Sequence, residues 1–221
     1  MARASTARRL DDSQTEQALR VPSFGGGDPP SPPIRDNEPV VSNARLGVLA
    51  LLGAEAMFFA GLIGAFLVFR LASSTWPPPF QPRLPIGVTG VNTGILLLSA
   101  YTMHLGLRAL RDGAVRQFVR LLLATGALGA IFLLIQGYEW IRLIHFGLTV
   151  SSSVYGGLFY TLIGFHGIHV VGALIWLAAV LIQAQRGRFS PRRYTGVQTC
   201  AMYWTFVVAL WPILYGLVYL Y

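Results

Sequence analysis

The hydrophobic positions of this chain are concentrated after residue 45, in five long apolar stretches separated by short polar links. The stretches cover approximately residues 46–71, 84–107, 118–141, 155–183 and 197–219. Each is close to the ~20 apolar residues with which an α-helix crosses about 30 Å of hydrocarbon. The pattern therefore predicts an all-α integral membrane bundle of five transmembrane helices.

The first 45 residues differ in composition from the rest of the chain. They hold six of the nine acidic residues, and the segment 24–39 is crowded with glycine and proline. Such a segment cannot bury an apolar core. It also lacks the apolar stretch of 7–15 residues that a secretory signal contains. We therefore expect two regions, a polar Gly/Pro-rich N-terminal arm over residues 1–45 and a membrane domain over residues 46–221.

The placement of arginine predicts the orientation of the helices, because the chain contains no lysine. The second and fourth links and the span ends beside them carry Arg108, Arg111, Arg116, Arg120, Arg186, Arg188, Arg192 and Arg193. The first and third links offer only Arg70, Arg83 and Arg142. The positive-inside rule then places the N-terminus in the cytoplasm and the C-terminus in the periplasm. Because the arginines sit at span ends, the net charge of +8 does not indicate a nucleic-acid partner.

An ionisable residue inside a predicted span is costly and marks a candidate functional position. Glu55 is the clearest case, since it lies nine residues into the first span and therefore about 13 Å deep. No basic residue lies near it in the sequence. We expect the Glu55 carboxyl to be protonated or to find a hydrogen-bonding group on another helix. His169, about three to four helical turns from the cytoplasmic end of the fourth span, is a second candidate.

Further polar residues gather toward the outer ends of the second and third spans. Gln136, Glu139 and Arg142 are spaced at i, i+3 and i+6, so they line one helix face. Asn92 and Thr93 lie at a comparable depth in the second span. This placement favours a polar seam between the two spans. An interfacial ion pair of Glu139 with Arg142 is the plainer alternative.

His166 and His169 are three residues apart on the fourth span, a spacing that would permit two metal ligands. Further ligands are scarce, because Cys200 is the single cysteine and only His104 and His145 remain. We therefore expect no metal site, and we expect both imidazoles to hydrogen-bond across helices. Small residues at helix-packing spacing favour a compact bundle. These pairs are Gly61 with Ala65, Gly90 with Gly94, and Gly126 with Ala130.

Five segments, in this order along the membrane domain, resemble subunit III of the haem-copper respiratory oxidases, the superfamily of cytochrome c and quinol oxidases. They are AEAMFFAGLIGAF around Glu55, WPPPFQPRLPIGVTGVNTGILLLSA with Asn92 and Thr93, GAIFLLIQGYEW with Gln136 and Glu139, VYGGLFYTLIGFHGIHVVG with His166 and His169, and YWTF with Tyr203 and Trp204. The resemblance covers residues 46–221, and the chain looks like a short, five-helix bacterial form of the family.

The resemblance implies a non-catalytic subunit of a proton-pumping terminal oxidase that reduces dioxygen to water. In this family subunit III binds no haem and no copper, which lie in partner subunits. It packs beside catalytic subunit I in the bacterial inner membrane, holds phospholipid in a cleft between its helices and supports proton uptake. Glu55 stands where the family has a buried, carbodiimide-reactive glutamate. The candidates for an intramembrane polar or lipid-cleft role are Asn92, Thr93, Gln136, Glu139, His166, His169, Tyr203 and Trp204.

Two departures from the family pattern stand out. Larger members have seven spans, and this chain corresponds to the later five. The family's last helix usually has histidine and aspartate where this chain has Thr205 and Val208.

Two other functions remain open from the sequence. One is a subunit-III-like accessory protein of a nitric oxide reductase. In that case the catalytic subunit that co-purifies with this chain would have an active site with iron rather than copper. The other is a small proton-coupled transporter, although the chain lacks the internal repeats and interrupted spans typical of transporters. With four histidines and one cysteine the chain has too few ligands to be a metal-bearing subunit of an oxidase.

Overall fold

The computed structural model describes residues 43–76, 78, 84–190 and 194–220. Within these residues, five helices are long and apolar enough to cross a membrane. They are α2 (Asn43–Ala72), α3 (Ile86–Arg111), α4 (Val115–His145), α5 (Val154–Gln185) and α6 (Thr195–Tyr215), and α6 continues into a π-helical turn, η1 (Gly216–Leu220). The five predicted spans and the all-α class are confirmed. The first helix begins at Asn43, so the last residues of the predicted arm are helical, and residues 1–42 lie outside the described part.

Three of the helices end in the same way, and these ends set the turns of the bundle. Gly113, Gly147 and Gly187 follow α3, α4 and α5 with φ of 78°, 90° and 69°, values that glycine adopts without strain. After each glycine a backbone N–H donates to a carbonyl five residues back, as in Ala114 N to Ala109 O at 2.9 Å. This Schellman arrangement satisfies carbonyls that the helix end would leave unpaired.

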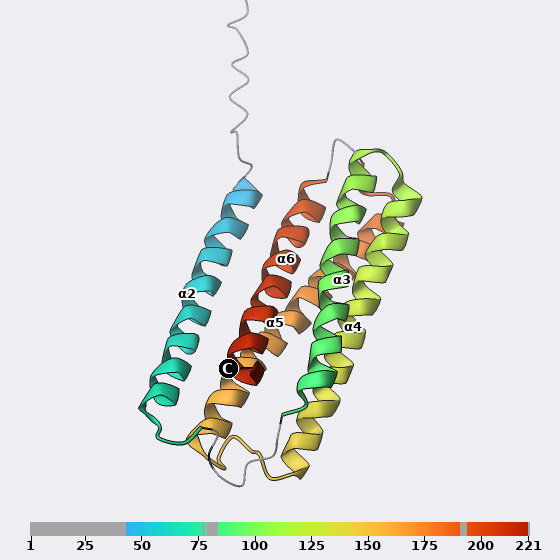
Figure 1. Ribbon diagram of the computed structural model, residues 1–221. Coiled ribbons are helices and arrows are strands. Elements are labelled where there is room, and N and C mark those ends of the chain that lie inside the picture. The colour runs from blue at the N-terminus through green and yellow to red at the C-terminus, as the bar shows by residue number, and fades with distance from the viewer. Residues whose placement is uncertain (1–42, 77, 79–83, 191–193, 221) are drawn as a thin grey trace, which may run out of the picture. The chain divides into compact units, whose positions relative to one another are not determined.

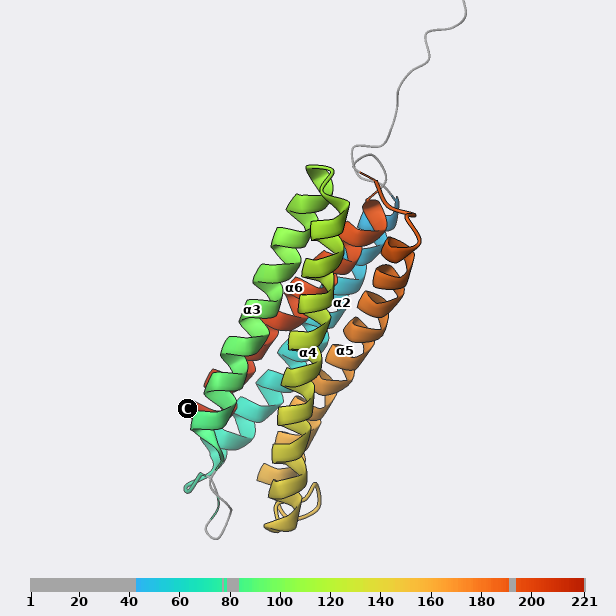
Figure 2. The same cartoon turned by 90° about the vertical axis from the view of Figure 1, so that its right-hand side faces the viewer.

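The helices run side by side and alternate in direction (Figure 1). α3 and α4 form a closely packed antiparallel pair, and α5 and α6 pack against that pair and against each other. α2 stands at the opposite side of the bundle and packs against α6 and α5, as the two views agree (Figure 2). The start of α2, the α3–α4 turn and the start of α6 share one end of the bundle.

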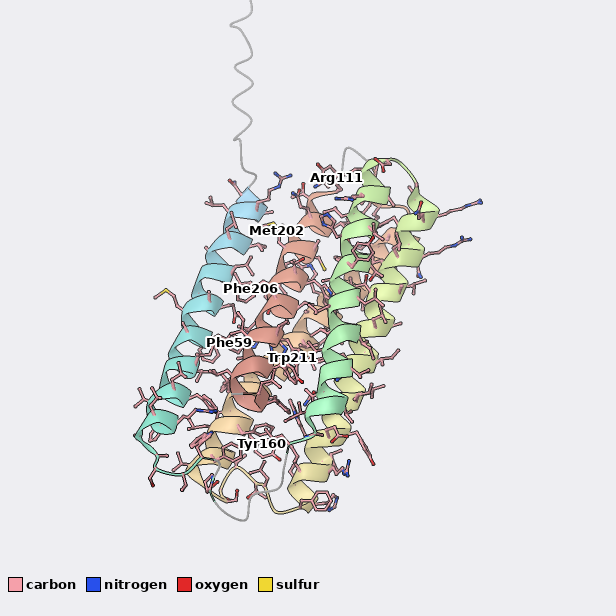
Figure 3. The ribbon with its side chains drawn as sticks, in the orientation of Figure 1. Phe59, Arg111, Tyr160, Met202, Phe206 and Trp211 are labelled. Atoms are coloured by element: carbon pink, nitrogen blue, oxygen red, sulfur yellow. The ribbon has the colours of Figure 1, made fainter. Side chains whose placement is uncertain are left out.

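Burial is uneven among the helices. The core lies between α3, α4, α5 and α6, and its largest fully buried side chains include Trp204, Trp211 and Phe132. Only Phe59 and Phe66 of α2 are buried. Phe59 points from α2 into the bundle (Figure 3), where its ring meets those of His166 and His169 on α5. α2 therefore depends more than the other helices on a few individual contacts for its position.

Candidate functional site

Glu55 and His169 meet between α2 and α5. The Oε2 atom of Glu55 lies 2.6 Å from Nε2 of His169, and the two side chains are 17% and 16% exposed. The two residues are more than a hundred positions apart in the sequence, so the periodicity of a single helix cannot predict that they meet. The expectation that Glu55 finds a hydrogen-bonding group on another helix is confirmed, and the group is the imidazole of His169.

The second ring nitrogen of His169 fixes the hydrogen-bonding pattern of the pair. His169 Nδ1 lies 2.6 Å from the backbone oxygen of Phe165. Because a carbonyl oxygen only accepts, Nδ1 must carry a hydrogen and donate it. A proton then lies between His169 Nε2 and Glu55 Oε2, bound either to the imidazole or to the carboxyl. The pair is an ion pair in the first case and a neutral hydrogen bond in the second.

Aromatic side chains of α2 and α5 surround the pair. The ring centroids of Phe58 and Phe165 are 5.1 Å apart, and Phe59 contacts the His169 ring edge-on at 5.2 Å. Phe58 and Phe165 are 41% and 40% exposed, so they cover the pair on the outside of the bundle. Apolar neighbours of this kind lower the local dielectric and strengthen the hydrogen bond between carboxyl and imidazole.

A second polar cluster lies between α3, α4 and the end of α6. Asn92 Nδ2 donates to the backbone oxygen of Phe132 at 3.0 Å, which joins α3 to α4. Trp211 Nε1 donates to Thr93 Oγ1 at 2.9 Å, and Gln136 Nε2 donates to the hydroxyl of Tyr219 at 3.1 Å. Of the residues predicted to form a seam between the second and third spans, Asn92 therefore bonds to the backbone of α4, whereas Thr93 and Gln136 bond to side chains of α6 and η1.

Glu139 extends this cluster toward the far end of α4. It is 5% exposed, and its Oε1 lies 3.8 Å from Arg142 Nη1 one helical turn later. Arg142 itself is exposed, with its guanidinium 5.7 Å from the centre of the Phe146 ring. The ion pair that the spacing suggested is present, with the carboxyl buried and the guanidinium outside.

His166 differs from the prediction. Its ring is 1% exposed and stacks on Trp211 with centroids 5.0 Å apart. Neither of its ring nitrogens has a hydrogen-bond partner among the described residues. The expected hydrogen bond across helices is therefore wrong for His166, although correct for His169. The two side chains are about 60° apart around the helix axis, and His166 faces the interior while His169 reaches α2.

The fifth span contributes through its aromatic residues. Tyr203 is buried with its ring centroid 5.6 Å from that of Trp176, and Trp204 Nε1 donates to Ser99 Oγ at 3.2 Å. Thr205 is exposed and its hydroxyl donates to the Ala201 oxygen of its own helix, while Val208 is buried. The two residues that depart from the family pattern thus lie in different environments, Thr205 on the outside of the bundle and Val208 inside it.

The structure divides the predicted site residues between two places. Glu55 and His169 form a half-buried pair at the α2–α5 contact, and Asn92, Thr93, Gln136, Glu139, His166 and Trp204 lie inside the α3–α6 core. The hydrogen-bonding roles of Trp211, Tyr219 and Ser99 were not predicted, because aromatic and serine residues are common in spans and carry no spacing signal. In the described part of the chain, no group of three or more His, Cys, Asp or Glu side chains is placed to hold a metal ion.

Comparison with known proteins places these features in a family context. Residues 35–221 match the family described as cytochrome c oxidase subunit III. A probable cytochrome c oxidase subunit 3 of Nocardia farcinica is 38% identical over 176 residues, which are 79% of this chain and 86% of the relative. Cytochrome c oxidase subunit 3 of Synechocystis is 38% identical over 79% of this chain and 74% of its own length. The Papio hamadryas protein of the same name is 34% identical over 82% and 70% respectively.

Proposed function

This chain belongs to the cytochrome c oxidase subunit III family, and we propose that it packs beside the catalytic haem-copper subunit and sustains that subunit's turnover. It is a multi-pass membrane protein and part of an oxidoreductase complex with other subunits. Subunits III of this family carry no redox centre of their own. Reduction of dioxygen to water therefore takes place at the haem and copper of a partner subunit.

The outer surface of the bundle supports an assembly role. α2 exposes large apolar side chains along most of its length, among them Leu46 at 62%, Met57 at 78% and Leu71 at 73%. In a membrane such a surface faces lipid tails or the helices of another subunit. We propose that both neighbours are present, phospholipid over part of the surface and the catalytic subunit over the rest.

The charge distribution supports an orientation in a bacterial inner membrane. Among the described residues, Arg108, Arg111, Arg116, Arg120, Arg186 and Arg188 are exposed at the end of the bundle where α2 begins. Arg70 and Arg142 are the described arginines at the other end. The positive-inside rule assigns the arginine-rich end to the cytoplasm and the C-terminal end to the periplasm.

The observation that carries the turnover role is the Glu55–His169 pair. It is a proton-sharing pair inside the membrane, and it joins the helix with the fewest buried residues to the rest of the bundle. We propose that the pair keeps α2 in place and so maintains the subunit contact over many turnovers, without taking part in the oxygen chemistry.

The test replaces Glu55 by Gln and follows oxygen consumption by the purified oxidase from the first turnovers to inactivation. We expect an unchanged initial rate and a shorter active lifetime, because the amide weakens the contact but leaves the metal centres intact. Met57→Leu is the control, since Met57 is exposed on the same helix. An immediate loss of initial rate, with intact haem and copper spectra, would contradict the proposal.

The catalytic partner itself can be identified by purification through this chain. The oxidase names of the relatives support a partner with haem and copper rather than the partner of a nitric oxide reductase. Metal analysis of the complex should therefore find copper together with haem iron. An active site that contains haem and non-haem iron without copper would favour the reductase alternative.

A further inference from the structure

Three polar side chains in the core retain polar atoms that no described residue satisfies. These are Oδ1 of Asn92, Oε1 of Gln136 and both ring nitrogens of His166. The three residues come from α3, α4 and α5, and they are 1%, 2% and 1% exposed. Buried polar atoms are nearly always hydrogen-bonded to protein or to ordered water, because an unpaired one has lost its hydration without compensation. Their presence in one bundle indicates that a further hydrogen-bonding partner binds there.

The three side chains surround the same pair of aromatic residues, Trp211 of α6 and Tyr219 of η1. His166 stacks on Trp211 at 5.0 Å, and Gln136 binds the hydroxyl of Tyr219 at 3.1 Å. Asn92 binds the backbone of Phe132, whose ring meets Trp211 at 5.0 Å. The rings of Trp211 and Tyr219 are themselves 6.5 Å apart. Gln136 and His166 therefore each contact one of these two aromatic residues, and Asn92 is linked to Trp211 through Phe132.

Turning the side chains over cannot provide hydrogen-bond partners for all of these atoms. Asn92 must point its NH2 group at the Phe132 oxygen, since a carbonyl oxygen only accepts, and this leaves Oδ1 without a donor. If the Gln136 amide is turned over, the Tyr219 hydroxyl can donate to Oε1, but then Nε2 loses its acceptor. A neutral imidazole has one donor and one acceptor nitrogen, and both face the interior at His166.

We infer that ordered water binds between α3, α4 and α5 beside Trp211 and Tyr219, and that it completes the hydrogen bonding of Asn92, Gln136 and His166. Each water offers two donors and two acceptors, so two waters supply enough donors for the two amide oxygens and the acceptor nitrogen of a neutral imidazole, and one of their oxygens can accept from its N–H. A lipid headgroup does not fit, because all three side chains are almost fully enclosed.

The first experiment is a high-resolution cryo-electron microscopy map of the intact oxidase that contains this subunit. We expect water density within hydrogen-bond distance of Asn92 Oδ1, Gln136 Oε1 and one ring nitrogen of His166. Well-resolved side chains without such density would overturn the inference. This measurement uses the unaltered complex, so it does not depend on the folding of any variant.

The second experiment replaces His166 by Phe in the same complex and measures thermal unfolding. Phenylalanine keeps the stack on Trp211 and removes both nitrogens. If water is bound there, the variant loses the hydrogen bonds of the imidazole and the unfolding temperature falls by about 2–4 °C. If the region is dry, removal of two unpaired nitrogens raises the unfolding temperature, and the inference fails. His104→Phe is the control, because His104 is exposed on α3, and we expect no shift there.

Discussion

Glu55 and His169 are joined by a contact of 2.6 Å between carboxyl oxygen and ring nitrogen, and this contact connects α2 to α5 in the middle of the bundle. A second polar contact, from the Arg45 guanidinium to Oε1 of Gln198, connects the start of α2 to α6. Since α2 buries only Phe59 and Phe66, these two links supply much of the specificity with which it is positioned. The pair is thus the most direct place to test how the bundle is held together.

We predict that Glu55 and His169 are energetically coupled. Glu55→Gln, His169→Gln and the double variant form a double-mutant cycle in the purified complex. We expect an interaction free energy of about 0.5–3 kcal/mol, because contacting residues in one hydrogen-bonded pair do not contribute additively. The measurement is the free energy or temperature of unfolding of each variant. Strictly additive effects would show that the two side chains do not stabilise each other.

We predict that Gly129 is required for the contact between α4 and α6. A Cβ atom at this position would lie 2.5 Å from Cη2 of Trp204 and 3.1 Å from Cδ2 of Leu174. Gly129→Ala should therefore displace the indole, weaken its hydrogen bond to Ser99 and destabilise the subunit by about 1–3 kcal/mol. Thermal unfolding and tryptophan fluorescence measure both effects.

The matched control for this substitution is Gly137→Ala on the same helix. A Cβ at Gly137 has no atom within 4 Å, so the change should be neutral or slightly stabilising. Equal destabilisation by the two substitutions would indicate a general intolerance of α4 to alanine rather than a clash with Trp204.

We predict that Thr93→Val destabilises the core although the two side chains have nearly the same shape. Valine cannot accept the hydrogen bond from Trp211 Nε1, which would then be a buried donor without a partner. The expected loss is about 1–3 kcal/mol in the free energy of unfolding. Thr205→Val is the control, because Thr205 is exposed and bonds only within its own helix. A similar loss at both positions would argue against a specific role for the Trp211 contact.

We predict that the link between α4 and α5 faces the periplasm and the link between α5 and α6 faces the cytoplasm. Cysteines introduced at Val150 and Arg186, both exposed, report on the two sides, while the native Cys200 is buried. A membrane-impermeant thiol reagent added to intact spheroplasts should label Val150→Cys and spare Arg186→Cys. The reverse labelling pattern would refute the assigned orientation.

The sequence by itself determined the number, type and approximate limits of the membrane helices. Hydrocarbon thickness sets the length of an apolar span, and this signal is local, so five stretches could be located without any tertiary information. The same reasoning singled out Glu55, because a carboxyl at membrane depth is costly wherever it points. It also predicted that the Glu55 carboxyl is protonated or finds a hydrogen-bonding group on another helix, without indicating which residue supplies that group.

Tertiary structure decided which residues meet. His166 and His169 look equivalent in sequence, yet in the bundle His169 meets Glu55 of α2 and His166 stacks on Trp211 of α6. The glycines selected by spacing differ in their surroundings: a Cβ added at Gly61 or Gly94 would have no atom within 4 Å, whereas one at Gly90 would lie 3.0 Å from the Tyr215 hydroxyl. The tightest contact with an indole, that of Gly129 with Trp204, was not selected by spacing. Such contacts depend on the rotation and crossing of helices distant in the chain. Periodicity along one helix carries no information about these quantities, because they are set by how all five helices pack together.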